Sequence, residues 1–521
     1  MGLTLALGER YLWVDRLCIV QNDVGDGGTL SQVAKMDKIY AGAYLTIIAA
    51  ATDKITTSLL HVEDMSALSE KEIVNIMSAR YGSLSRSRWA TRGWTYQEQI
   101  LCKRAVVLVD WGFFWDCQCS IWDGVDLVPG QDFDGVRLRA DMGQRFATRW
   151  WPDFGFYLDL ICPYNGREFS YPQDTLLGIS GVLNALGNSF PGGFIHGLPR
   201  LFLDHTLLWQ PFGTAERRLG RREDEEIRTS LPSWSWAGWQ CYRSEPILEP
   251  LELDKLVGLG YTHQDDMNLT DWVVVERDSR QSQSNDTYWY NKRESWTYFR
   301  HPIPISGSCV NRNLLAAQAY LTCSTTTATY LPVTVLHKKG QNSWCSFGPP
   351  KISVFEDRIF SSGPRNDKVC SVLVLQRPNG GFGGLLRMMV NDIIDEYASI
   401  ELIAISKGSA TARDMRQSFE WRIYETAQDA EWDLLHSWYR ARLELFGAIP
   451  KVAGDLVDGF DRVPASAKAR PSEVDEKILC EFYNVLWIER RDGMAYRRAC
   501  GWVPKHVWEA NATGPIEVKL G

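Results

Sequence analysis

The residues best suited to chemistry are Trp94 and Glu98, in the stretch RGWTYQE at residues 92–98. If this stretch is helical, residues four apart share one face, so an aromatic ring lies beside a carboxyl group. Desolvation by such a ring raises the pKa of the carboxyl group, as a general base or a ribose-binding acid requires. The alternative is a surface glutamate that pairs with Arg92 or Lys103, and the spacing alone favours this alternative.

Asp15 is the second candidate, because it interrupts the apolar stretch YLWVDRLCI at residues 11–19. A buried charge costs several kcal/mol unless it is paired. Asp15 is therefore either a structural partner of Arg16 or another base, or a site group at the end of a strand. The residue types favour structural pairing.

The sequence contains none of the common catalytic or metal-binding motifs. The motifs GxSxG, GxxxxGK[ST] and HExxH and a complete GxGxxG are absent. The twelve cysteines are dispersed without a CxxC, and the eight histidines form no cluster, so we expect no metal site and no cofactor. Residues 41–51 form the longest nearly uncharged apolar run, which is about half the length needed to span a bilayer. With no signal-peptide pattern before it, we expect a reduced, cytoplasmic protein.

The elements that must position these residues read as an α/β arrangement. We expect a buried strand at 11–19, a helix that presents Met36, Ile39 and Tyr40 on one face, and a second strand at 45–50. Strand, helix and strand in this order predict a parallel sheet. A helix at 93–101 then carries Glu98.

Two further strands are expected at 105–109 and 113–115, joined by a turn. These elements place a first domain at 1–125. Residues 126–245 mix helical and loop patterns, and residues 246–521 read as a β-rich domain. That domain ends in a hairpin with strands at 483–489 and 495–503 around an Asp492–Gly493 turn, and a helix is expected near 427–446.

Composition narrows the class of protein. The chain has 521 residues, 12% of them aromatic, and a net charge of −8, which excludes disorder throughout and gives no basic footprint for nucleic acid. The 22 tryptophans are roughly three times the usual share. Clusters such as Trp234, Trp236 and Trp239 could stack on sugars or bases, but core packing is the commoner role of large aromatic residues.

Several stretches resemble a known family. YLWVDRLCIVQND (11–23), MDKIYAGAYLTIIAA (36–50) and RGWTYQEQILCKRAVVL (92–108) look like successive motifs of the fungal heterokaryon-incompatibility (HET) domain. Longer proteins with this domain are similar to four further stretches, namely GREFSYPQDTLLGISGVL (166–183), FIHGLP (194–199), LPSWSWAGW (231–239) and YNVLWIERRDGMAYRRACGWV (483–503). The resemblance implies a cytosolic fungal protein of non-self recognition, which triggers cell death through self-association or protein partners.

The resemblance also implies a fold and a second activity. HET domains are regarded as distantly similar to TIR domains, which have a flavodoxin-type parallel sheet and in some cases cleave NAD with a WCxxE helix motif. Trp94 and Glu98 match that spacing, although Thr95 replaces the cysteine. By this resemblance, Glu98 would be the catalytic carboxylate and Trp94 a nucleotide-binding residue. Asp15 would line the same crevice at the strand ends.

One family element has no counterpart here. An earlier segment like LSYxWG normally precedes the YLWVD strand, so we expect an incomplete TIR-like sheet, either in a truncated chain or in a decayed member without activity. The leading hypothesis is therefore an incompatibility protein that acts by association. NAD glycohydrolase activity, with NAD as substrate, is the alternative, and a Trp-rich carbohydrate- or base-binding module comes last.

Overall fold

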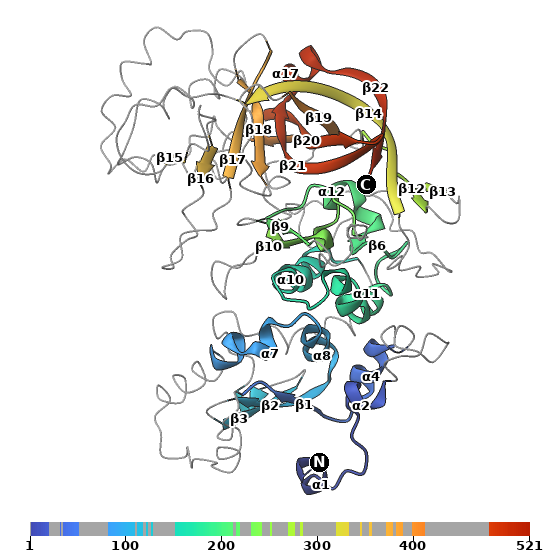
Figure 1. Ribbon diagram of the computed structural model, residues 1–521, viewed down its shortest axis with the longest axis vertical. Helices are drawn as coiled ribbons and strands as arrows, with labels where there is room; N and C mark the ends of the chain where they lie inside the picture. The colour runs from blue at the N-terminus through green and yellow to red at the C-terminus, as the bar shows by residue number, and fades with distance from the viewer. Residues whose placement is uncertain are drawn as a thin grey trace. The chain divides into compact units, whose positions relative to one another are not determined.

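The computed structural model divides the chain into two compact units (Figure 1). The first, here the N-terminal unit, comprises Met1–Pro152 and Arg167–Phe190, and the second, the C-terminal unit, comprises Asp153–Gly166 and Pro191–Gly521. The residues described are 2–19, 32, 35–51, 82–109, 112–117, 121–122, 127–128, 152–211, 215–218, 231–241, 251–252, 269–276, 282–284, 319–332, 344–345, 354–356, 371–378, 382–388, 399–411 and 479–521.

The sheet of the N-terminal unit has five strands in the order β1-β2-β3-β4-β5. These are β1 (Thr46–Ala49), β2 (Arg104–Val109), β3 (Gly112–Cys117), β4 (Ile121–Trp122) and β5 (Leu127–Val128). The predicted strands at 45–50, 105–109 and 113–115 are confirmed. Alternate side chains of β2 and β3 point into the core, where Val107 and Phe114 are 1% exposed.

The helices described before and after these strands include α1 (Gly2–Ala6), α2 (Asp15–Cys18), α4 (Met36–Gly42), α7 (Arg88–Thr91) and α8 (Thr95–Leu101). Residues 167–190 add the 3₁₀ helices η2 (Pro172–Thr175) and η3 (Leu177–Ile179) and the helix α11 (Ser180–Leu186). The predicted helices around Tyr40 and Glu98 are confirmed. Helices α4, α8 and α11 contact one another, which brings Tyr40 and Glu98 into one helical cluster.

The predicted strand at 11–19 is wrong. Residues 11–14 belong to no strand, and residues 15–18 form α2. Tyr11 is 85% exposed and Leu17 is 79% exposed, so the apolar stretch is not buried. A buried strand would have desolvated Asp15 and Arg16, whereas a short surface helix keeps both charges in water.

The sheet also differs from the predicted flavodoxin type. Among the described strands of the N-terminal unit, β1 and β2 form the one parallel pair, and every other pair is antiparallel. The parallel pair is joined by a crossover that contains α7 and α8, as a parallel connection requires. The α/β character is therefore confirmed, with an antiparallel extension at one side of the sheet.

The C-terminal unit is β-rich, as predicted, and its main sheet has eleven strands. They are β12 (Val273–Glu276), β13 (Ser282–Ser284), β14 (Ala319–Pro332), β15 (Trp344–Cys345), β16 (Val354–Glu356), β17 (Ser371–Gln376), β18 (Phe382–Met388), β19 (Ile400–Thr411), β20 (Leu479–Arg491), β21 (Met494–Pro504) and β22 (Thr513–Leu520). The hairpin predicted at 483–503 is confirmed by the pairing of β20 with β21. The helix expected near 427–446 lies outside the described residues.

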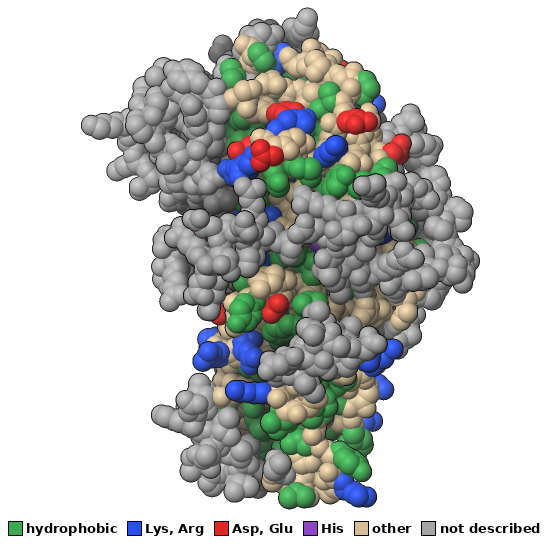
Figure 2. Space-filling model, turned by 45° about the vertical axis from the view of Figure 1, so that its right-hand side comes forward, with side chains coloured by type: hydrophobic (Ala, Val, Ile, Leu, Met, Phe, Trp, Pro, Cys, Tyr) green, Lys and Arg blue, Asp and Glu red, His purple; other side chains and the backbone are tan. Residues whose placement is uncertain are grey.

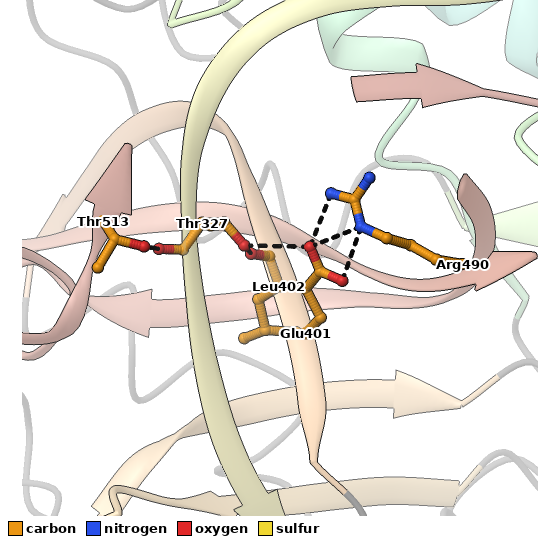
Figure 3. A network of polar contacts seen from close by, with 5 residues as sticks. All are labelled: Thr327, Glu401, Leu402, Arg490 and Thr513. Atoms are coloured by element: carbon orange, nitrogen blue, oxygen red, sulfur yellow. Dashed lines mark hydrogen bonds and ion pairs between the residues drawn. The ribbon is translucent and has the colours of Figure 1, made fainter. Parts of the chain in front are cut away.

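Polar side chains tie the long strands together at the surface of this sheet (Figure 3). Arg490 on β20 forms an ion pair with Glu401 on β19 at 2.8 Å. Thr327 on β14 donates to the Leu402 carbonyl at 2.8 Å, and Thr513 donates to the Thr327 carbonyl at 3.4 Å. Helix α17 (Lys505–Asn511) packs beside the strands, and its Trp508 is 1% exposed.

The remaining described elements of the C-terminal unit are short helices and short strands. They are α10 (Phe154–Asn165), β6 (Phe194–Ile195), β7 (Leu198–Pro199), η4 (Arg200–Phe202), α12 (Leu203–Thr206), β8 (Gln210–Pro211), β9 (Ala215–Arg217), η5 (Trp236–Gly238), β10 (Trp239–Cys241) and β11 (Leu251–Glu252). Most of their apolar side chains are fully buried.

Candidate functional site

Glu98 lies in the first turn of α8, partly buried where α8 faces α4. The Tyr40 hydroxyl, on α4, donates a hydrogen bond to the Glu98 carboxylate. Burial raises the pKa of Glu98 to about 7, and the negative charge of Asp15 adds to the rise. The positive charges of Arg92 and Arg167 and the hydrogen bond from Tyr40 act in the opposite direction. Of the two partners considered for a surface ion pair, Arg92 does act on Glu98, but burial has the larger effect on its pKa.

Asp15 lies in α2, and its side chain is exposed. Its carboxylate accepts a hydrogen bond of 2.7 Å from the backbone N–H of Arg16, which is a main-chain contact and differs from the charge pairing that the sequence suggested. Asp15 nevertheless lies near enough to raise the pKa of both Glu98 and Tyr40. The structure thus brings the two predicted carboxyl groups together although the predicted strand is wrong.

Trp94 directly precedes α8 with helical backbone angles (φ −60°, ψ −37°), and its side chain is partly buried. The predicted spacing of Trp94 and Glu98 on one helical path is therefore present. A second tryptophan also belongs to the neighbourhood. The Trp13 ring packs edge-on against the Tyr40 ring, with centroids 5.8 Å apart, and is 36% exposed.

Sequence reasoning missed three members of this group: Trp13, Tyr40 and Arg167. The sequence predicts Tyr40 on the apolar face of a helix, and this position suggests no role for its hydroxyl group. The Tyr40 ring is 8% exposed, and burial together with the Glu98 and Asp15 charges raises the pKa of its hydroxyl. Arg167 stands 69 positions after Glu98, and only the fold brings the two together. The one signal in the sequence was the hydroxyl group of Tyr40 on an otherwise apolar helix face, because a buried tyrosine hydroxyl needs a hydrogen-bond partner.

The tryptophan cluster proposed as a sugar or base platform is a core instead. Trp234 and Trp236 are 0% exposed, and Trp239 is 3% exposed. The indole N–H of Trp239 donates to the Ser233 carbonyl at 2.8 Å, so its polar edge is also occupied. These rings have no free face on which a ligand could stack.

The described part of the chain contains neither a candidate metal cluster nor a helix suited to a membrane. No group of three or more His, Cys, Asp or Glu side chains there could hold a metal ion. No helix there is both long enough and apolar enough to cross a membrane.

The arrangement supplies a carboxyl group that can exchange a proton near neutral pH. Both protonation states are populated when the pKa lies near the working pH, which suits acid–base work. The Tyr40 hydroxyl and the Arg92 and Arg167 charges hold the ionised form, whereas Asp15 and burial oppose it. Glu98 is therefore the residue of this group that is able to act as acid or base.

Comparison with known proteins gives one family. Residues 1–98 match the family model described as heterokaryon incompatibility protein (HET). A search of curated proteins and a search of solved structures gave no match. Within the matched range lie Trp13, Asp15, Tyr40, Trp94 and Glu98.

Proposed function

Because residues 1–98 form a HET domain, we propose that this chain acts in heterokaryon incompatibility. It is a cytoplasmic fungal protein that promotes cell death when its HET domain associates with a protein partner or with a second copy. The family match carries this proposal, and the surface of the N-terminal unit supports it.

That surface carries apolar side chains that a monomer would normally cover. All the exposed large hydrophobic residues of the described part of the chain lie in the N-terminal unit: Leu3, Leu5, Leu7, Tyr11, Leu12, Trp13, Leu17, Tyr44, Ile47 and Tyr171. Seven of the ten fall between residues 3 and 17. Figure 2 shows hydrophobic side chains on the visible surface of this unit, with Lys and Arg among them. Exposed apolar patches of this kind mark interaction surfaces.

The test changes this surface and follows both association and cell death. Leu5 and Leu17 are 76% and 79% exposed, so Leu5→Ser with Leu17→Ser removes apolar surface without opening the core. We expect weaker co-precipitation of two differently tagged copies, or of the partner, and better survival of fungal cells after induced expression. The matched control is Glu517→Ser with Lys519→Ser, two exposed positions on β22. Unchanged association and unchanged death in the leucine variant would contradict the proposal.

The second candidate is hydrolysis of NAD at Glu98, favoured by the raised pKa of this carboxyl group and by its closeness to Asp15. Water would add to the ribose carbon while nicotinamide leaves, and ionised Glu98 would polarise the ribose hydroxyl. The relation to TIR domains that suggests this activity draws on the Trp94–Glu98 spacing and on the parallel β1–β2 unit.

Glu98→Gln separates the two candidates, because glutamine keeps the size of the side chain and removes its charge. If death proceeds by association, cells expressing the folded variant die as before and the apolar-surface variant survives. If NAD is the substrate, the Glu98→Gln variant spares both the cells and their NAD, measured in the same extracts. Thermal unfolding of the purified variant verifies that it is folded.

A further inference from the structure

Residues 167–169 dock on the turn that leads into α8. The Glu168 N–H donates to the Thr91 carbonyl at 2.7 Å, and the Gly93 N–H donates to the Glu168 carbonyl at 2.8 Å. These bonds form a parallel bridge between Arg92 and Glu168. A segment about seventy positions away thus adds backbone hydrogen bonds to the entrance of the helix that carries Glu98.

Arg167 binds this turn with its guanidinium group. Its Nη1 donates to the Arg92 carbonyl at 3.1 Å and lies 3.2 Å from the Thr95 hydroxyl oxygen. Its Cζ lies 4.7 Å from the centroid of the Tyr96 ring, over which a guanidinium packs favourably. The side chain is 7% exposed. One buried cation therefore contacts the carbonyl, the hydroxyl and the ring that surround the start of α8.

The fit is close as well as polar. A Cβ atom on Gly93 would lie 1.8 Å from the Phe169 ring, so the two segments touch where a side chain is missing. The Thr95 hydroxyl donates to the Trp89 and Arg92 carbonyls at 2.6 and 2.8 Å, which holds the same turn from inside. The start of α8 is thus fixed from both sides, three residues before Glu98.

We propose that Arg167, which lies outside the range 1–98 that matches the HET family model, is a positioning residue of the Glu98 site. Arg167 holds the first turn of α8 so that the Glu98 carboxyl group meets Tyr40, and it places a positive charge beside that carboxyl group. The inference rests on the proposed function only in treating Glu98 as a functional residue.

Arginine suits this place better than lysine. Its Nη1 reaches an oxygen on each of two residues while the planar guanidinium group lies over a ring, whereas lysine offers a compact charge on a flexible stem and no flat face. The Arg167 charge lowers the pKa of Glu98. Lysine should keep part of this electrostatic effect and lose the fixed geometry, so the two contributions can be measured apart.

The experiment uses the full chain and follows the ionisation of Glu98 by its effect on thermal stability. Unfolding temperatures are measured from pH 4 to 9 for wild type, Arg167→Gln and Arg167→Lys, each with and without Glu98→Gln. Within each pair, the difference follows the ionisation of Glu98 together with its electrostatic effect on its neighbours, and these neighbours (Asp15, Tyr40 and Arg92) are the same in every pair. This difference changes with pH between the pKa of Glu98 in the unfolded chain and its higher pKa in the folded chain. The upper limit of this pH range therefore reports the folded chain, and this limit is the transition that we compare between variants.

In Arg167→Gln we expect this transition at higher pH than in wild type, with a lower unfolding temperature. In Arg167→Lys we expect a smaller upward shift with a similar loss of unfolding temperature. Arg104→Gln is the matched control, because Arg104 also lies over a tyrosine ring of this unit, 5.5 Å from the Tyr44 centroid, and is not among the charges that act on Glu98. In the control the transition should stay in place.

A transition that does not move in Arg167→Gln would overturn the proposal, whatever happens to the unfolding temperature, because a purely structural arginine affects all pH values alike. If Arg167→Gln fails to fold, Tyr96→Leu takes its place. That variant removes the ring under the guanidinium, and a shift to higher pH supports the proposal whereas no shift overturns it. None of these outcomes depends on cell death or NAD, so the proposed function can fail separately.

Discussion

At the scale of single residues, the candidate site depends on the protonation of Glu98. Burial and Asp15 raise its pKa to about 7, while Arg92, Tyr40 and Arg167 stabilise its charged form. Burial dominates this balance, because taking a carboxylate out of water disfavours the charged form more than the nearby partners favour it. The consequence is a carboxyl group that ionises within the pH range of the cell.

This balance predicts how stability depends on pH. The unfolded chain releases the Glu98 proton near the ordinary glutamate pKa of 4.5 and the folded chain near pH 7, so between these values the folded state holds more protons and loses stability as pH rises. Glu98→Gln removes this loss, which amounts to at most about 3 kcal/mol before solvent screening of a partly exposed group reduces it. Urea unfolding at pH 4, 5.5 and 8 measures it. The control is Glu517→Gln, a change of the same kind at an exposed position, in which we expect the same pH dependence of stability as in wild type. If stability also changes with pH in Glu98→Gln as steeply as in wild type, the assignment to Glu98 is wrong.

At the scale of elements, the close contact of Gly93 with Phe169 predicts a steric effect. Gly93→Ala places a methyl group 1.8 Å from the Phe169 ring and should cost about 1–3 kcal/mol of stability, the usual range for overpacking. Phe169→Ala also destabilises the chain, but the double variant should be more stable than the sum of the two single changes implies. Chemical denaturation of the four proteins measures the coupling. Simple additivity would show that the two residues do not touch.

The β20–β21 hairpin predicts a purely conformational effect. Asp492 and Gly493 have φ angles of 51° and 78°, and a Cβ on Gly493 would meet nothing within 4 Å. Gly493→Ala therefore changes only the backbone preference and should cost roughly 1 kcal/mol, since L residues disfavour positive φ. Asp492→Asn is the control, because asparagine tolerates this conformation. Equal unfolding temperatures for Gly493→Ala and wild type would rule out the assigned turn.

At the scale of the whole molecule, the family match and the folded unit have different limits. The match ends at residue 98, but β1 pairs with β2 at residues 104–109, and α4 and α8 pack on α11 at residues 180–186. A fragment of residues 1–98 therefore leaves one side of β1 and of both helices without its partner. We expect it to show no cooperative thermal transition by circular dichroism, whereas the full chain shows one. A cooperative transition in the fragment would mean that residues 99–190 are dispensable for the fold.

Residues that are close together in the sequence were sufficient to predict most of the local elements. Hydrophobic periodicity and turn residues predicted β1, α8, the β2–β3 pair, the C-terminal hairpin and the β-rich character of the C-terminal unit, because these features depend on neighbouring residues. The short motifs likewise pointed to the HET family and to Glu98.

The tertiary structure was needed for the remaining features. It turned residues 15–18 into a surface helix, since an apolar stretch forms a strand only where a neighbour offers hydrogen bonds and burial. It also placed Tyr40 and Arg167 beside Glu98, because contacts between distant segments leave no periodic trace in one sequence. The pKa of Glu98 follows from that assembly, since burial is a property of the packed helices and not of the RGWTYQE stretch itself.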